Sequence, residues 1–163
     1  MQIIGKLSLE PYKRDEITRV NTTFEMRDAV RKKINDADIL IMAAAVSDFR
    51  PKERLGGKIK REKTDQINIV LERTDDILKS LSELKKNRIF VGFALSNDID
   101  KVAPLKLKEK NLDIIVANTI SAMEKDKSSG FILTKTGRKV EFENLEKEKI
   151  ASLILEEVLK IAK

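Results

Sequence analysis

An apolar run without polar alternation constrains the fold of this chain most. Residues 38–42 read Asp-Ile-Leu-Ile-Met, and three alanines and a valine continue the run to Val46. A strand that is apolar at successive positions suits a parallel sheet covered on both faces, whereas a half-exposed strand alternates apolar and polar residues. We therefore expect Asp38 to Val46 to form a central strand, with the small alanines leaving room for a ligand beside the backbone.

A charged segment follows this strand. Residues 47–51 read Ser-Asp-Phe-Arg-Pro, and residues 58–61 read Lys-Ile-Lys-Arg. In open α/β sheets, ligands bind beyond the carboxyl ends of the strands. An acidic side chain near several basic ones could hold a polyanion with its counter-cation, and a nucleoside triphosphate with magnesium fits that description. The alternative interpretation is an ordinary solvated turn after a buried strand.

Apolar strands and amphipathic helices alternate along the rest of the chain. We expect strands at 17–20, 67–71 (half-buried), 89–95 and 112–117, and a long polar loop at 47–66. Helices are expected from Thr22 or Thr23 to about Asp36, from Thr74 or Asp75 through Leu84, and at 98–110. A β-hairpin at 131–142 and a closing helix at 145–162 complete the pattern. This order predicts an α/β fold with a three-layer, Rossmann-like, mostly parallel sheet and right-handed crossovers.

The composition restricts the chemistry that the chain can perform. Its 163 residues fit one domain, and only 4% are aromatic, so the core must consist mainly of aliphatic side chains. The sequence contains no Cys and no His. Disulfides, thiolate chemistry, Cys/His metal sites and an imidazole base are therefore excluded. Any reaction must use carboxylates, amines, amides and the backbone.

The net charge of +6 is spread along the chain. Such a distribution suits a small anionic ligand about as well as a nucleic acid, although the few aromatic residues disfavour a stacking platform for single strands. No apolar run approaches the roughly 20 residues of a membrane span, and the start lacks the pattern of a signal peptide. We therefore expect a cytoplasmic protein without membrane contact.

Several segments together resemble the phosphopantothenate-cysteine ligase family of coenzyme A biosynthesis. They are residues 43–51, 58–61, 76–78 (Asp-Ile-Leu), 91–94 (Val-Gly-Phe-Ala) and 110–113 (Lys-Asn-Leu-Asp). The similarity runs from about Leu7 to the C-terminus, and the segments stand in the family's order and spacing. Gly92-Phe93-Ala94 alone would indicate only a strand packed under a helix.

The resemblance implies a reaction and its partners. In the family, the carboxylate of 4'-phosphopantothenate attacks the α-phosphorus of CTP, which gives an acyl-cytidylate and pyrophosphate. The amine of cysteine then displaces CMP and forms an amide. Magnesium accompanies the nucleotide, and family members form homodimers. Because this chemistry needs positioning and charge stabilisation rather than a protein nucleophile, the absence of Cys and His is no obstacle.

The resemblance also implies a set of site residues. Lys58 matches the catalytic lysine that meets the phosphates as pyrophosphate departs. The implied nucleotide-binding residues are Met42, Ala43, Ala44, Asp48, Lys58, Asp75, Asp76, Ile77, Leu78, Phe93, Lys106 and Lys110. Without the family, a solvated surface would be the simplest interpretation of the three lysines. Asp48 would lie beside the polar edge of the nucleotide or its metal, and the protein ligands of the metal are unknown.

Three departures from the family pattern leave alternatives open. The family's first strand, Gly-rich phosphate loop and catalytic asparagine have no counterpart before Arg14, so we expect an N-terminally truncated relative. The segments at 74–77 and 92–97 differ from the usual wording, and so does the one at 128–131. A non-catalytic CTP-binding module of the same family is therefore the alternative to an active ligase. A basic nucleic-acid-binding domain is a third hypothesis, with strong salt dependence as its signature.

Overall fold

The computed structural model describes residues 1–5, 16–53, 56–57, 66–120 and 127–162. The chain forms two compact units. The first contains residues 1–29 and 45–77, and the second contains residues 30–44 and 78–163. Within the described ranges, no helix is long and apolar enough to cross a membrane.

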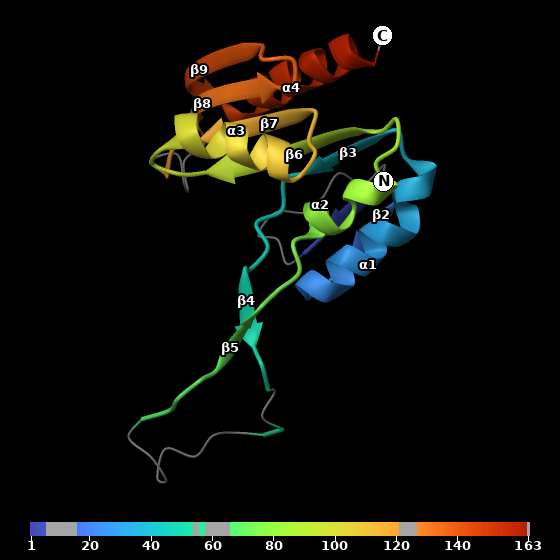
Figure 1. The fold of residues 1–163 in the computed structure, drawn as a ribbon, viewed down its shortest axis with the longest axis vertical. Helices are drawn as coiled ribbons and strands as arrows, with labels where there is room; N and C mark the ends of the chain where they lie inside the picture. The colour runs from blue at the N-terminus through green and yellow to red at the C-terminus, as the bar shows by residue number, and fades with distance from the viewer. Residues whose placement is uncertain (6–15, 54–55, 58–65, 121–126, 163) are drawn as a thin grey trace. The chain divides into compact units, whose positions relative to one another are not determined.

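A five-stranded sheet forms the second unit, in the order β3-β6-β7-β8-β9 (Figure 1). The strands β3 (Ile39–Met42), β6 (Ile89–Leu95) and β7 (Ile114–Asn118) run parallel. The strands β8 (Lys127–Thr134) and β9 (Lys139–Glu146) add an antiparallel hairpin. The predicted α/β fold with a C-terminal hairpin is therefore confirmed.

Helices cover both faces of this sheet. On one face, Ile150, Ile154 and Val158 of α4 (Lys147–Ile161) pack into a core cluster with alternate residues of β6, β7, β8 and β9. On the other face, α3 (Ile99–Glu109) contacts β6 and β7 and buries Ala103 completely. A single turn, α2 (Ile77–Ser80), and the 3₁₀ turn η3 (Ser82–Leu84) connect to β6. The strand and helix periodicities in the sequence predicted a sheet with helices on both faces, and the structure has this arrangement.

The expected central strand is shorter and more exposed than predicted. It ends at Met42 rather than Val46, and among the described residues it pairs only with β6, at the edge of the sheet. Ile39 and Ile41 are 40% and 43% exposed, so the prediction of a strand covered on both faces is wrong. An apolar run indicates burial but cannot show which neighbours supply it, and alanine is a weak strand former.

The first unit contains a short parallel pair, β1 (Gln2–Ile4) and β2 (Ile17–Arg19). Helix α1 (Thr23–Lys33) follows β2. The Thr22 hydroxyl accepts a hydrogen bond from the Glu25 amide at 3.1 Å, and the Glu25 carboxylate accepts one from the Asn21 amide at 2.7 Å. These bonds satisfy backbone donors at the start of the helix, which was expected at Thr22 or Thr23. The helix closes in the 3₁₀ turn η1 (Ile34–Asp36), which confirms the predicted end.

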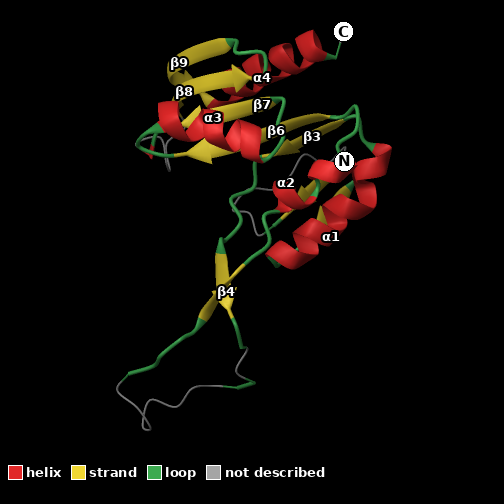
Figure 2. Cartoon of the chain, viewed as in Figure 1, coloured by secondary structure: helices red, strands yellow, loops and turns green. Residues whose placement is uncertain are grey.

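A short two-stranded antiparallel ribbon begins within the loop expected at 47–66, of which residues 54–55 and 58–65 lie outside the described residues. Strand β4 (Phe49–Pro51) pairs with β5 (Leu71–Arg73), and both appear as strands in Figure 2. Ile67, Ile69 and Leu71 are all more than half exposed, so the half-buried strand predicted at 67–71 is also wrong. Alternating apolar residues lead to a half-buried strand only if a second layer of the structure covers the apolar face.

Candidate functional site

The carboxyl ends of the three parallel strands gather several predicted residues in the second unit. Met42 ends β3 and pairs with Gly92, and β6 continues for three residues to Leu95, which pairs with Asn118 at the end of β7. Beyond Met42, Ala43 and Ala44 have no regular secondary structure and are exposed. Their backbone groups are therefore open to a ligand at the edge where α/β sheets bind them.

The predicted aromatic residue and the predicted helix lysines belong to opposite faces of the sheet. Phe93 is partly buried and packs against the core cluster under α4. Lys106 lies in the last turn of α3 and Lys110 directly follows the helix; a backbone hydrogen bond of 3.0 Å joins them, and both are half-buried. The last turn of α3 leads into the start of β7, so these lysines lie toward the amino ends of the strands, away from Ala43 and Ala44.

In the predicted segment Asp75 to Leu78, the last two residues could contact a ligand only through their backbone groups. The side chains of Ile77 and Leu78 are 2% and 6% exposed. Helix α2 has only four residues, so the dipole of a long helix does not add to the backbone amides. The carboxylate of Asp75 forms an ion pair with Arg27. The nucleotide role of this segment stays a prediction.

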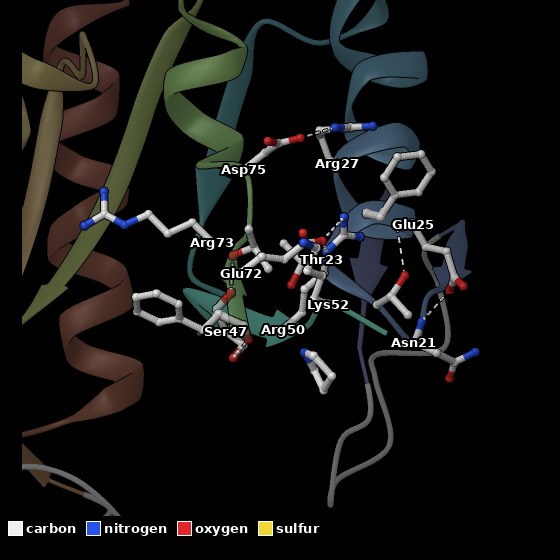
Figure 3. Close-up of a pocket in the computed structure, with 15 residues that line it drawn as sticks. Asn21, Thr23, Glu25, Arg27, Ser47, Arg50, Lys52, Glu72, Arg73 and Asp75 are labelled. Atoms are coloured by element: carbon white, nitrogen blue, oxygen red, sulfur yellow. Dashed lines mark hydrogen bonds and ion pairs between the residues drawn. The ribbon is translucent and has the colours of Figure 1, made fainter. Parts of the chain in front are cut away.

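A hollow of about 700 Å³ lies in the first unit (Figure 3). The start of α1, the ribbon strands β4 and β5, and the residues that flank them line it. The lining residues are Asn21, Thr22, Thr23, Phe24, Glu25, Arg27, Ser47, Phe49, Arg50, Pro51, Lys52, Glu72, Arg73, Thr74 and Asp75. Of the predicted site residues, only Asp75 belongs to this lining. The sequence pattern did not single out the others except in the charged segment from Ser47.

Paired charges surround this hollow. Arg27 contacts both Asp75 and Asp28, and its guanidinium carbon lies 4.3 Å from the centre of the Phe24 ring. The hydrogen bond to Asp28 raises the pKa of Arg27, which therefore stays charged. Arg50 pairs with Glu72 at 2.8 Å. These pairs balance most of the charge, and Figure 3 shows Arg73 directed away from the Arg27–Asp75 pair.

The remaining predicted residues are Asp48 and Lys58. Asp48 is exposed, and its carbonyl accepts a hydrogen bond from the Thr74 amide at 2.9 Å. Its carboxylate has no side-chain partner within the described part of the chain and could meet a polar or cationic group of a ligand. Lys58 lies outside the described residues, so its catalytic role stays a prediction.

Two buried side-chain atoms at the sheet edge lack a hydrogen-bond partner. Among the described residues, these are Oδ1 of Asn118 and Oγ of Ser128. Asn118 directly follows the strand expected at 112–117, and no role was predicted for its side chain. The available signal was a polar residue that directly follows a buried apolar strand.

Comparison with known proteins identifies the family. Residues 1–161 match the family described as the DNA/pantothenate metabolism flavoprotein C-terminal domain. This chain belongs to that family. It is 38% identical over 167 residues to the coenzyme A biosynthesis bifunctional protein CoaBC of Bacillus subtilis, covering 99% of this chain and 41% of the relative. The corresponding protein of Borreliella burgdorferi is 36% identical, with 85% and 36% covered.

Solved structures agree with this family assignment. The C-terminal domain of CoaBC has a TM-score of 0.79 and 32% identity, with 96% of this chain and 70% of that domain covered. A Cab2 mutant in complex with phosphopantothenate-cysteine has a TM-score of 0.64 at 17% identity, which supports the fold alone. The family predicted from the sequence segments is thus confirmed, and the chain spans less than half the length of the curated CoaBC relatives described above.

Proposed function

We propose that this chain acts in coenzyme A biosynthesis as a CTP-dependent phosphopantothenate-cysteine ligase. The carboxylate of 4'-phosphopantothenate attacks the α-phosphorus of CTP and releases pyrophosphate. The amine of cysteine then attacks the acyl carbon and releases CMP, leaving the amide of 4'-phosphopantothenoylcysteine. The observation that carries the proposal is the family match over residues 1–161, together with the family segments at 43–51, 58–61 and 91–94.

The proposed chemistry relies on charge and position. Lys58 would stabilise the negative charge that develops as pyrophosphate departs, without transferring a proton. Lys106 and Lys110 would bind the nucleotide from α3, and the exposed backbone at Ala43 and Ala44 would approach it at the carboxyl edge. Each of these groups would either position the substrates or stabilise the charge on the phosphates.

Magnesium fits this proposal as a companion of the nucleotide. The described residues contain no group of three or more carboxylates placed to hold a metal ion. Mg²⁺ commonly binds through one or two carboxylates, waters and substrate phosphates rather than through a protein cage. Asp48, with its exposed carboxylate, could contribute one such ligand. When bound, the ion would neutralise charge on the phosphates.

A homodimer is also part of the proposal. Phe49, Ile67, Ile69, Val70 and Leu71 are between 48% and 67% exposed on and beside the ribbon of the first unit. Clustered apolar exposure of this kind is typical of association surfaces. Sedimentation equilibrium of the purified chain tests this point, and a monomer at micromolar concentration would contradict it.

The test of the proposed function is product release. The chain is incubated with CTP, magnesium and 4'-phosphopantothenate, and pyrophosphate and CMP are measured with and without cysteine. We expect pyrophosphate with phosphopantothenate, and CMP that depends on cysteine. Lys58→Ala should lower the rate at least tenfold, whereas the exposed lysine variant Lys149→Ala should match the parent. Release of neither product by the parent would contradict a ligase.

A non-catalytic CTP-binding module is the second candidate. The altered wording at residues 74–77 and 92–97, close to the proposed nucleotide contacts, favours it. This alternative predicts saturable CTP binding by the parent without pyrophosphate release. Both the ligase and the non-catalytic module should bind CTP, but only the ligase should release pyrophosphate and CMP.

A further inference from the structure

Asn118 has an unsatisfied side chain on a fixed backbone. Its carbonyl accepts a hydrogen bond from the Ser96 amide at 3.2 Å, and its residue pairs across the sheet with Leu95 and Gly130. The backbone is therefore held on both sides. Oδ1 of the side-chain amide is buried and has no hydrogen-bond partner among the described residues.

A second unsatisfied group lies at the same end of the sheet. Ser128 is two residues from Gly130 on β8, its side chain is 7% exposed, and its hydroxyl also lacks a partner. A buried polar group without a partner costs roughly 1–3 kcal/mol, and buried polar groups in proteins are seldom left so. Both of the orphan atoms found among the described residues thus lie at the edge where α/β sheets bind ligands.

The surroundings of Asn118 distinguish the parts of a nucleotide. Side chains alternate along β7, so Asn118 lies on the same face as Val116, which belongs to the cluster under α4. Phe93 pairs with Val116 and Leu95 pairs with Asn118, so an aromatic and an aliphatic side chain are its neighbours on β6. Lys106 and Lys110 lie at the C-terminal end of α3, on the opposite face and toward the amino ends of the strands. Apolar and aromatic neighbours suit a base or sugar, whereas lysines suit phosphates.

We infer that Asn118 is a binding residue for the nucleoside part of the nucleotide, through hydrogen bonds from and to its side-chain amide. This inference rests on the proposed function, since it assumes that a nucleotide binds at the carboxyl edge of the sheet. Rotation about the last side-chain bond presents the amide donor and acceptor to the ligand, because that rotation is soft. The ligand then satisfies groups that the protein leaves unsatisfied.

Two substitutions test the inference by calorimetric titration. Asn118→Leu keeps the approximate shape of the side chain and removes both polar groups. Asn68→Leu changes the same residue type at an exposed position of the first unit. Each variant and the parent chain are titrated with magnesium-CTP and, separately, with magnesium and inorganic triphosphate, and their melting temperatures are measured.

For Asn118→Leu, we expect CTP binding to weaken roughly threefold to tenfold, while inorganic triphosphate binds as it does to the parent. The melting temperature should stay the same or rise, because replacing an unsatisfied buried acceptor by an apolar group of similar shape is nearly neutral or stabilising. Asn68→Leu should bind both ligands like the parent.

Three outcomes would overturn the inference. Unchanged CTP affinity in Asn118→Leu would show that the amide does not contact the nucleotide. An equal loss for CTP and triphosphate, with a lower melting temperature, would show a structural role. A parent chain that binds neither ligand would contradict the nucleotide site of the proposed function itself, and the inference with it.

Discussion

Asp113 is a buried acidic residue of the second unit with three partners. Its carboxylate accepts hydrogen bonds from the Phe90 amide at 2.8 Å and from Lys135 at 3.2 Å, and pairs with Lys85 at 2.9 Å. The side chains of Asp113 and Lys85 are each 6% exposed. Lys85 also donates to the Asn111 carbonyl at 2.7 Å. This cluster joins the start of β6 to the residues just before β7.

Removing this carboxylate should destabilise the fold. Asp113→Asn leaves the buried Lys85 without its counter-charge, and breaking a buried pair in this way costs about 3 kcal/mol or more. Urea unfolding measures the change. Glu109→Gln, which breaks the exposed pair between Lys79 and Glu109, should cost about 0–1 kcal/mol. Equal costs for the two variants would contradict a buried, coupled role for Asp113.

The same residue should make stability depend on pH. Burial alone would raise the pKa of Asp113, but hydrogen bonds from Lys85 and the Phe90 amide hold it below its ordinary value of 3.8. A lowered folded pKa contributes stability above the unfolded pKa, and that contribution is lost as the pH falls through the folded value. The parent should therefore lose more unfolding free energy than Asp113→Asn below about pH 5. Parallel pH profiles of the two proteins would argue against this linkage.

Gly130 occupies a position where β7 and β8 approach closely. A Cβ atom at this residue would lie 1.9 Å from the Ala117 carbonyl oxygen, which is backbone and cannot move aside. Gly130→Ala should therefore destabilise the protein by about 1–3 kcal/mol, as overpacking does. At Gly56 nothing lies within 4 Å of the added atom, so Gly56→Ala should change stability by about 0.5 kcal/mol or less. Thermal unfolding of both variants checks the difference.

At the scale of elements, the start of α1 depends on its cap. Thr22→Ala removes the acceptor of the Glu25 amide and should cost about 1 kcal/mol of unfolding free energy. Thr23→Ala is the matched control, since Thr23 begins the helix without a side-chain cap bond among the described contacts. Chemical denaturation of both variants should separate them, and equal stability would mean that Thr22 does not cap the helix.

Elements with strong local signals were predictable from the sequence. Strand β6 coincides with the predicted 89–95, and α3 lies within one residue of the predicted 98–110, because apolar periodicity and helix boundaries are local properties. The exposure of Ile39 and the pairing of β4 with β5 were not predictable. They depend on which strand lies beside each edge, and the periodicity of one segment does not contain that information.

For the candidate site too, some residues were predictable from the sequence and others were not. The family resemblance implies Phe93, Lys106 and Lys110 as site residues, and this prediction needs no coordinates. Asn118 could not be identified in this way, because an unsatisfied atom is defined by the groups that surround it in the folded chain. The Arg27 pairing with Asp75 likewise joins residues 48 positions apart, and sequence spacing gives no sign of it.

At the scale of the whole molecule, the central claim is that this chain binds a cytidine nucleotide as a member of its family. The most direct measurement is a calorimetric titration of the 163-residue chain with magnesium-CTP, beside magnesium-ATP, at moderate salt. We expect saturable binding that prefers CTP and weakens in Lys58→Ala. Absence of saturable binding, or binding to both nucleotides that collapses as salt increases, would contradict the account.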